Sequence, residues 1–364
     1  MKIFLFAALA VFLFACSEKE NGFTIKVKLD GALGKVVLAE NVGGNLVGVD
    51  TADFVKGAAT LKGSVEYPHE YYLSLDRGRS NAVIFVENTK MEVLGNIDSL
   101  NLIKVSGSIT HDEYQELIDQ INNVQLEYLS VYQDARDAFA AGDSVKGQGL
   151  LEKVQDMYES IDDIQADFVK DHPSSYLSPV VLLEIQNNID FEVLEALVNG
   201  LDPKILEIPS MAELKERVEL LGKIAVGQIA PDFTQNDPNG NPVKFSEIYS
   251  QNEVTLLDFW ASWCQPCRAE NPNVVAVYND YKDKGFTVFG VSLDLEKDSW
   301  LKAIQDDKLH WTQVSDLAYW NNVVANEYGI NSIPSSLLVD KTGKIIARDK
   351  RGDELREMVS EILD

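Results

Sequence analysis

The sequence predicts a multidomain protein with a β-rich N-terminal domain, a helical middle segment and a C-terminal α/β domain. Three observations support this fold class. Short runs of alternating apolar and polar residues, separated by turn signals, fill residues 17–108. Helical apolar stripes with a strong acidic excess occupy residues 109–222. Apolar strands alternate with helical stretches over residues 223–364, which is the pattern of an α/β layer.

Composition limits the possible function classes. Of the 364 residues, 45% are hydrophobic and 25% are charged, as in an ordinary folded protein. The formal net charge of −26 argues against nucleic-acid binding, because nucleic acid carries the same sign of charge. The three cysteines are Cys16, Cys264 and Cys267, which are too few for a disulfide-stapled scaffold or a Cys-rich zinc site.

Residues 1–16 have the features of a targeting segment. Lys2 precedes a 12-residue apolar run at residues 3–14, which is too short to span a bilayer and has the length of a secretory signal core. The run leads into the sequence LFAC, which resembles a bacterial lipobox, although Phe14 is larger than the residue usual there. We therefore predict a signal peptide, a lipidated Cys16 and a location outside the cytoplasm. A secretory signal with an incidental cysteine is the alternative.

The predicted strands of residues 17–108 follow one another closely. The first, Phe23–Leu29, alternates apolar and polar residues. Similar runs follow at Lys35–Glu40, Ala58–Val65, Tyr71–Asp76, Val83–Glu87 and Met91–Gly95. The turn signals between them favour an antiparallel sheet or sandwich. Titratable side chains are scattered here, so we predict no catalytic site in this domain.

The middle segment changes to helical periodicity. Thr110 and Glu113 have the spacing of a capping box that opens a long helix, and further helical stretches are predicted at about residues 144–171 and 176–199. Residues 109–222 contain 24 acidic and 7 basic residues, a net charge of −17. Such a charge run usually marks a solvated helix face, and a docking surface for a basic partner is the alternative.

Strands and helices alternate in the C-terminal domain. Strands are predicted at Val254–Phe259, Thr287–Val291, Ser336–Asp340 and Ile345–Ala347. Helices are predicted at about Cys264–Lys282, Ser299–Gln305 and Asp353–Leu363, and Phe245–Tyr249 fits a short strand or a helix start. The apolar composition of the strands indicates a sheet that is covered by helices.

The cysteine pair lies where the first of these strands meets its helix, in the sequence LDFWASWCQPCR. Cys264 and Cys267 on the first helical turn can close a small disulfide ring. Unpaired N–H groups and the positive end of the helix dipole would stabilise a thiolate at Cys264. Cys267 lies deeper, where it could attack a mixed disulfide. Trp263 would flank the nucleophile and limit the access of water.

Other uses of this cysteine spacing fit less well. A c-type haem site needs a histidine where Arg268 stands, and a zinc ribbon needs a second cysteine pair or paired histidines. A copper site would depend on His310. Two structural core cysteines would leave the adjacent tryptophans unexplained, and the cysteine motif of peroxidases is absent. We therefore predict no metal and no cofactor.

Residues 227–364 resemble the TlpA/ResA-like branch of the thioredoxin family, whose members are extracytoplasmic thiol–disulfide oxidoreductases. The resemblance rests on Gly227, Ala230, Pro231, Asp232 and Phe233, on the LDFWASWCQPCR segment, and on Ile333-Pro334-Ser335 before a strand and a turn at residues 336–343. It implies a thioredoxin-like fold in which Pro334 is cis and faces the cysteine pair. Residues 17–222 resemble the extension that precedes such domains in Bacteroidetes lipoproteins.

The same resemblance implies roles for two carboxylates. Asp258 aligns with the buried aspartate that moves protons to the second cysteine, and Glu270 matches the active-site glutamate of the ResA-like branch. Glu270 follows Cys267 by three residues and therefore lies on the same helix face. The alternative interpretations are a hydrogen-bonded carboxylate at a strand end and a surface glutamate on a helix.

The predicted function is thiol–disulfide exchange in the cell envelope, with reduction of client disulfides as the expected direction. The implied partners are client proteins with thiols or disulfides, an upstream electron-donor redox protein, and a membrane reached through lipidated Cys16. The protein would face the periplasm, and exposure at the cell surface is the alternative. The rival function is that of a binding or scaffold lipoprotein with a regulatory redox domain.

Overall fold

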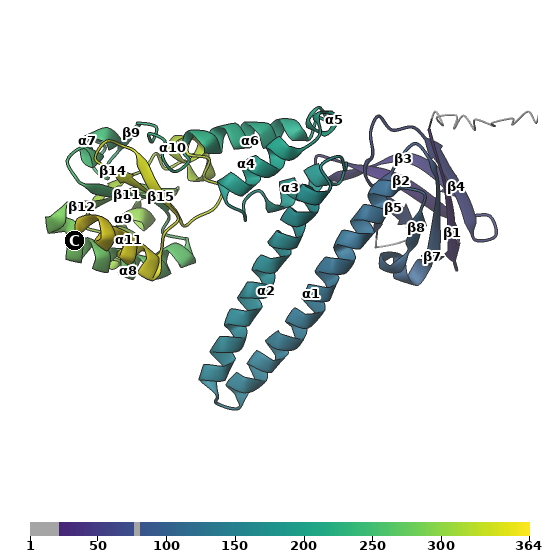
Figure 1. The fold of residues 1–364 in the computed structure, drawn as a ribbon, viewed down its shortest axis with the longest axis horizontal. Coiled ribbons are helices and arrows are strands. Elements are labelled where there is room, and N and C mark those ends of the chain that lie inside the picture. Colours follow the sequence, from purple (N-terminus) through teal and green to yellow (C-terminus); the bar gives the residue numbers. More distant parts are fainter. Residues whose placement is uncertain (1–21, 76–80) are drawn as a thin grey trace, which may run out of the picture. The chain divides into compact units, whose positions relative to one another are not determined.

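The computed structural model describes residues 22–75 and 81–364. The predicted signal peptide with Cys16 lies outside the described residues, as does the last residue of the predicted strand Tyr71–Asp76. The chain forms two compact units that divide between Val181 and Leu182, and each unit is described by itself. Figure 1 shows β-rich, helical and α/β parts in the predicted order, which confirms the fold class.

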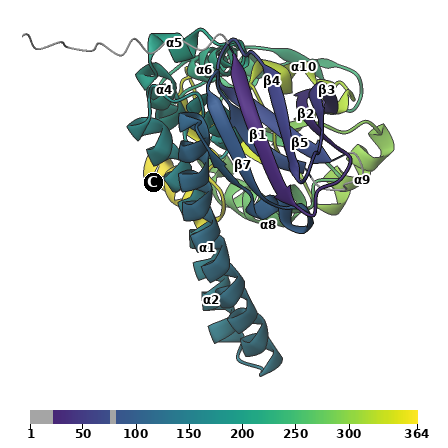
Figure 2. The ribbon, with the colours of Figure 1, turned by 90° about the vertical axis from the view of Figure 1, so that its right-hand side faces the viewer.

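Two four-stranded sheets form the β-rich part of the first unit, with the orders β4-β1-β7-β8 and β3-β2-β5-β6. The strands are β1 (Phe23–Asp30), β2 (Lys35–Val42), β3 (Asn45–Asp53), β4 (Ala58–Gly63), β5 (His69–Leu75), β6 (Asn81–Val86), β7 (Lys90–Asn96) and β8 (Lys104–Ser106). Ile25, Leu38 and Ile84 belong to one core shared by both sheets, so the sheets form a sandwich (Figure 2). β1 and β7 pair in parallel, a pairing that the turn signals do not predict.

Strand β3 has no counterpart among the predicted strands. It forms the edge of its sheet beside β2, and Leu46, Val47 and Val49 are between 43% and 51% exposed. Residues 45–49 are exposed on both faces of the strand. Because no face is buried there, the sequence lacks the alternation of apolar and polar residues that identifies a half-buried strand.

Helices α1 (Ile109–Ala140) and α2 (Ser144–Asp171) form an antiparallel hairpin (Figures 1 and 2). The capping box predicted at Thr110 is wrong. Ser108 is the N-cap of α1, because its hydroxyl accepts a hydrogen bond from the N–H of His111 at 3.0 Å. Thr110 therefore lies inside the first turn of the helix.

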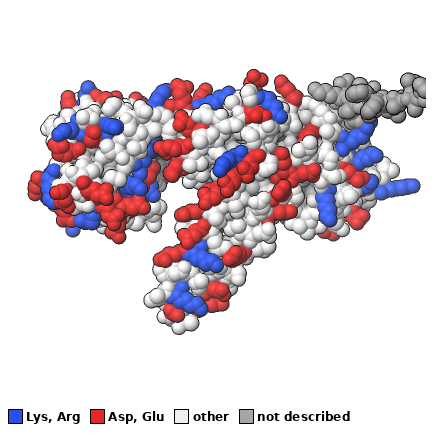
Figure 3. Space-filling view, viewed as in Figure 1, with Lys and Arg blue, Asp and Glu red and all other residues white. Residues whose placement is uncertain are grey.

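On the face of the hairpin that Figure 3 shows, acidic side chains are interspersed with basic and uncharged ones. Some of them make local contacts: Glu127 pairs with Lys153 at 3.2 Å between the two exposed helices. Asp143 caps α2 by accepting a hydrogen bond from the N–H of Lys146 at 3.0 Å. These contacts fit the interpretation of a solvated helix face, and a docking role for the acidic surface stays a prediction.

The second unit contains a five-stranded sheet with the order β13-β12-β11-β14-β15. Its strands are β11 (Val254–Trp260), β12 (Phe286–Ser292), β13 (Thr312–Val314), β14 (Ser335–Asp340) and β15 (Ile345–Arg348). Strand β11 pairs in parallel with β12 and antiparallel with β14. A separate two-stranded sheet holds β9 (Thr234–Asn236) and β10 (Pro242–Lys244). Each predicted strand of the large sheet is confirmed to within one residue, because its continuous apolar run is buried.

Helices precede and accompany this sheet. They are α4 (Phe191–Gly200), α5 (Pro203–Leu206), α6 (Met211–Lys223), α7 (Phe245–Tyr249), α8 (Gln265–Tyr281), α9 (Lys297–Asp306), α10 (Val323–Glu327) and α11 (Gly352–Leu363). Helix α8 packs against β12 and α11. The single helix predicted at 176–199 is two helices, α3 (Ser178–Ile185) and α4, because the polar residues after Ile185 interrupt the apolar stripe. Helices α4–α6 belong to the same compact unit as the sheet, although their acidic composition groups them with the middle segment.

Candidate active site

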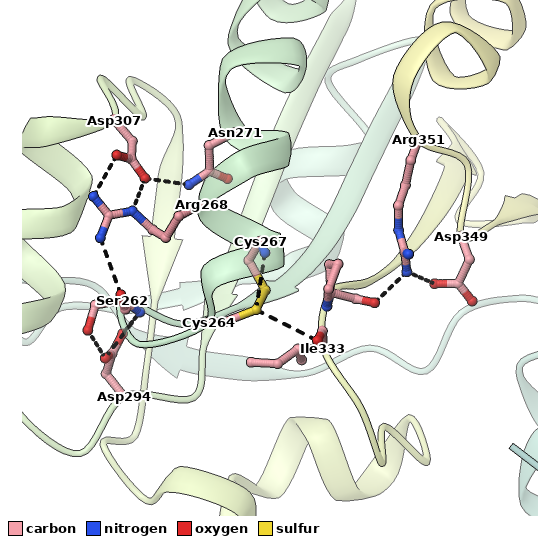
Figure 4. Close-up of a disulfide and its surroundings, with 11 residues drawn as sticks. Ser262, Cys264, Cys267, Arg268, Asn271, Asp294, Asp307, Ile333, Asp349 and Arg351 are labelled. Carbon is pink, nitrogen blue, oxygen red and sulfur yellow. Dashed lines mark hydrogen bonds and ion pairs between the residues drawn. A yellow bond between two sulfur atoms is a disulfide. The ribbon is translucent and has the colours of Figure 1, made fainter. Parts of the chain in front are cut away.

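The two cysteines of the second unit form a disulfide at the start of α8 (Figure 4). Strand β11 ends at Trp260, and a turn of three residues places Cys264 at the N-cap of the helix. The N–H of Cys267 donates to the Sγ atom of Cys264 at 3.2 Å. Both cysteines are buried, with exposed fractions of 4% for Cys264 and 2% for Cys267. The helix start therefore gives the first sulfur a backbone donor and the positive end of the helix dipole, which favour a thiolate there.

The loop before β14 lies against this disulfide. The Ile333–Pro334 peptide bond is cis, as the family resemblance implies. The carbonyl oxygen of Ile333 is 3.7 Å from the Sγ atom of Cys264, and Figure 4 shows the two side by side. The guanidinium of Arg351 donates to the carbonyl oxygen of Pro334 and lies 3.7 Å from the carboxylate of Asp349. The first sulfur thus faces a main-chain carbonyl whose loop is held by a charged side chain.

Asp258 occupies the middle of β11, where it lies opposite Ser336 of β14 and Gly290 of β12 in the sheet register. Burial, reinforced by the negative charge of Glu270, raises the pKa of Asp258 to about 7, and the positive charge of Arg351 opposes this shift. The carboxyl group of Asp258 can therefore take up and release a proton near neutral pH.

Glu270 lies in α8 and connects this helix to α11. Its Oε1 atom accepts hydrogen bonds from the N–H of Gly352 at 2.9 Å and from the side-chain amide of Asn273 at 2.8 Å. The contact with Gly352 satisfies an N–H group at the first residue of α11. Glu270 is therefore half-buried and bonded to a second helix, with its charge acting on Asp258.

Two further carboxylates hold the turn before Cys264 (Figure 4), and sequence reasoning missed both. Asp307, just after α9, forms a bidentate ion pair with Arg268. Arg268 also donates to the carbonyl oxygen of Ser262 at 3.2 Å. Asp294 is 1% exposed and accepts hydrogen bonds from the N–H of Ser262 at 3.0 Å and from its hydroxyl. Ser262 and Arg268 are visible in the cysteine motif, but their partners Asp294 and Asp307 lie 32 and 39 residues away from them, so only the fold identifies these partners.

Trp263 directly precedes Cys264, and its predicted role in limiting the access of water stays a prediction. Its side chain is 43% exposed, and its ring contacts those of Tyr319 and Trp320 at centroid distances of 5.1 and 6.1 Å. Residues 319–321 form a short 3-10 helix before α10. An exposed aromatic cluster therefore borders the turn that carries Cys264.

Residues 22–75 and 81–364 contain no cluster of three or more His, Cys, Asp and Glu side chains that could hold a metal ion. The copper alternative depended on His310, which is exposed and belongs to no such cluster. In the same part of the chain, no helix combines the length and the apolar character needed to cross a membrane.

Comparison with known proteins gives two family matches. Residues 226–348 match the AhpC/TSA family, and residues 23–114 match a domain of unknown function, DUF4369. Two similar curated proteins are thiol-disulfide oxidoreductases named ResA. The protein from Geobacillus kaustophilus is 31% identical over an alignment that covers 34% of this chain and 67% of the relative. The protein from Bacillus thuringiensis subsp. konkukian is 27% identical over an alignment that covers 39% of this chain and 78% of the relative. A solved structure, the thioredoxin domain of a thiol-disulfide oxidoreductase from Bacteroides vulgatus, is 39% identical, with a TM-score of 0.36 over 38% of this chain and 99% of that one.

Proposed function

The chain belongs to the family of ResA-like thiol-disulfide oxidoreductases, and from this premise we propose that it reduces disulfides of client proteins in the cell envelope. The observation that carries the proposal is the Cys264–Cys267 disulfide at the start of α8, with Cys264 against the carbonyl of Ile333. This arrangement supplies an activated sulfur and, beside it, a main-chain group to which an extended client segment could bind.

The first step of the proposed reaction starts from the reduced pair. The thiolate of Cys264 attacks one sulfur of the client disulfide, forms a mixed disulfide and releases the other client sulfur as a thiolate. The backbone donors at the start of α8 stabilise the attacking thiolate, and the carbonyl of Ile333 aligns the client main chain next to it.

In the second step, the thiolate of Cys267 attacks the Sγ atom of Cys264. The mixed disulfide breaks, the client leaves with two thiols, and the Cys264–Cys267 disulfide forms again. Two electrons have then passed to the client, and its two thiolates take up one proton released by Asp258 and one from the solvent. Asp258 accepts the proton of Cys267, because its raised pKa lets it hold a proton near neutral pH. Glu270 supports this role through its negative charge near Asp258.

The proposal also covers the direction of electron flow and the cellular location of the reaction. An upstream electron-donor redox protein reduces the disulfide after each turnover, and Cys16 anchors the protein to a membrane facing the periplasm. Support for the location comes from the signal-like residues 1–16, and support for the direction comes from the family resemblance. The acidic region before the catalytic domain would hold that domain away from the membrane and offer a docking surface.

The test is a disulfide-exchange assay on the purified full chain with dithiothreitol as the electron source. The wild-type protein should reduce a model protein disulfide, Cys264→Ser should be inactive, and Cys267→Ser should accumulate a mixed disulfide through Cys264. Asn279→Ser, a change at an exposed position of the same helix that keeps both cysteines, tests whether the effect is specific to them. Inactivity of the wild type would favour the scaffold alternative. A redox potential titration of the cysteine pair then gives the direction, since 30 mV corresponds to about 1.4 kcal/mol.

A further inference from the structure

The second unit contains a cavity of about 420 Å³ that the redox reaction does not use. It is bordered by the turn between α3 and α4, by helix α6, by strand β15 and by the loop before β14. Ser332 and Ser335, which flank the Ile333–Pro334 bond, also line it. Its volume lies within the range of small-molecule sites in proteins.

Two arginine side chains meet in this cavity, Arg217 from α6 and Arg348 from β15. In the part of the chain that the structure describes, their hydrogen bonds all go to neutral oxygens. Arg217 donates to the carbonyl oxygen of Gly329 and to the side chain of Asn187 at 3.2 Å, and Arg348 donates to the carbonyl oxygen of Ile224 at 3.3 Å. The Nε atom of Arg217 is buried and has no hydrogen-bond partner among the described residues. An unsatisfied donor of this kind is costly unless a ligand or water completes it.

The carboxylates around the cavity act on this arginine pair without bonding to it. Burial lowers the pKa of both guanidinium groups, and the charge of Arg348 lowers the pKa of Arg217 further. Asp349 and Glu192 act on Arg348 from a distance. The carboxylate of Asp349 is occupied, because it accepts hydrogen bonds from the hydroxyl of Ser335 and the N–H of Ser336, both at 2.9 Å. Two half-buried cations thus lie side by side without a bonded anion, which is unfavourable in a protein interior.

The basic residue Lys350 and the acidic residue Asp190 also line the cavity. The ammonium of Lys350 bonds to Glu354 at 2.9 Å, so it offers a ligand little free charge. Asp190 and Glu192 place negative charge on the same wall. Those two carboxylates would repel a second negative charge on a ligand, so the site favours a monoanion over a dianion.

Part of the remaining wall is apolar, beside the polar side chains of Gln186, Asn187 and Asn331, and the apolar part limits the ligand further. It is formed by Ile189, Phe191, Leu221, Ile330, Ile346 and Met358. We propose that this cavity is a binding site for a monocarboxylate with a short apolar chain, whose carboxylate lies between Arg217 and Arg348. Guanidinium groups bind carboxylates through paired, charge-assisted hydrogen bonds, and the apolar wall receives the chain.

Two kinds of ligand carry a carboxylate next to a short apolar group: a free short-chain acid and the C-terminus of a peptide. The test uses the full chain with Cys16→Ser, in its oxidised form, and ligand-observed NMR titrations. The probes are hexanoate, hexanol, inorganic phosphate, and the peptide acetyl-Ala-Leu-Leu with either a free or an amidated C-terminus. Binding of hexanoate alone identifies a free acid as the ligand, and binding of the free-carboxylate peptide identifies a peptide terminus. Hexanol, phosphate and the amidated peptide should bind at least tenfold more weakly.

Variants separate the arginine site from general charge effects. Arg348→Gln should weaken carboxylate binding at least tenfold, since it removes charge-assisted hydrogen bonds. Arg356→Gln is the matched control, because this arginine is exposed on α11 and pairs with Asp280 at 2.7 Å, outside the cavity. Arg348→Lys, which keeps the charge, provides a second variant if the glutamine variant fails to fold, and it should weaken binding because a lysine lacks the planar pair of donors. Equal binding of hexanol, binding of phosphate alone, or unchanged affinity in both Arg348 variants would overturn the proposal.

Discussion

The Sγ atom of Cys264 lies 3.7 Å from the carbonyl oxygen of Ile333, the residue that precedes the cis-proline. Sixty-nine residues separate the two along the chain, and the antiparallel pairing of β11 with β14 brings them together. The sulfur that would attack a client therefore faces a main-chain acceptor. An extended client segment that donates an N–H group to this carbonyl would be aligned beside the reactive sulfur.

Cys264 should have the lower thiol pKa of the pair, because it is the N-cap of α8 and accepts the N–H of Cys267. Alkylation of the reduced protein at mildly acidic pH should therefore label Cys264 first. Mass spectrometry of the labelled peptides checks the order. Faster labelling of Cys267 would reverse the proposed roles of nucleophile and resolving cysteine.

Replacing Asp258 with Asn should change how stability depends on pH. The pKa of Asp258 is about 7 in the folded chain, against an ordinary value of 3.8 for this side chain. The wild-type protein therefore loses stability as pH rises from about 4 to about 7, where the folded state binds the proton and the unfolded chain releases it. One pKa unit corresponds to about 1.4 kcal/mol, so Asp258→Asn should gain roughly 2–4 kcal/mol at pH 8 and little at pH 3.5. Urea unfolding at both pH values measures this difference, and an equal gain at both would show that charge is not its cause.

Glu270→Gln should lower the pKa of Asp258, because the charge of Glu270 helps to raise it. The amide oxygen of a glutamine can still accept the hydrogen bonds from Gly352 and Asn273, so the fold should be retained. NMR titration of the Asp258 carboxyl carbon gives the pKa directly. Glu354→Gln, an exposed change on α11, is the control, and an equal shift in both variants would exclude a specific effect of Glu270.

Cys16→Ala should release the protein from the membrane fraction or block its maturation. Acyl chains attached at Cys16 would contribute about 0.8 kcal/mol per buried CH₂ group, and the substitution removes them all. Disulfide exchange by the catalytic domain should be unaffected. Fractionation of cells followed by detection of the protein tests this, and a wild-type protein found only in the soluble fraction would contradict the predicted anchor.

A fragment of residues 224–364 should fold and keep most of its rate toward a small disulfide, yet be less stable than residues 182–364. The longer fragment retains the contact between Arg217 and Gly329 and the buried Leu214 and Leu221 of α6. Their loss should lower the Tm by at least about 5 °C, since 1 kcal/mol corresponds to several degrees in a domain of this size. Thermal unfolding of both fragments gives the comparison. An equal Tm would mean that α4–α6 add nothing to the stability of the catalytic domain, and a lost rate toward the small disulfide would mean that they shape the active site.

Most of the longer strands of the two units follow from local patterns, and two exceptions, β3 and β8, share a cause. The alternating run at Phe23–Leu29 and the apolar run at Val254–Phe259 each correspond to a strand with a buried face. Strand β3 and the three-residue strand β8 lack a fully buried stretch. Each is an edge strand that pairs with the strand just before it in the chain, and this pairing leaves no alternating pattern in its own residues.

The candidate site also has features that the sequence predicts and features that it does not. The cysteine pair and its place at a helix start can be predicted, because the motif combines a strand end with a helix start. The partners of that motif cannot, because the ion pair of Arg268 with Asp307 and the hydrogen bond of Glu270 to Gly352 join residues 39 and 82 positions apart. The family resemblance supplied Glu270 as a candidate, and only the fold shows that it is bonded to α11.

The exposed edge of the sandwich has a consequence for handling the protein. Over residues 45–49, β3 presents unpaired main-chain N–H and C=O groups together with three apolar side chains, and this stretch contains no lysine or proline. Such an edge is a template for a further strand, and other proteins protect theirs with a charged or kinked residue. Concentrated samples are therefore prone to join edge to edge at this strand, whatever the redox state of the cysteines. A lysine at position 47 would give the edge the charge that it lacks.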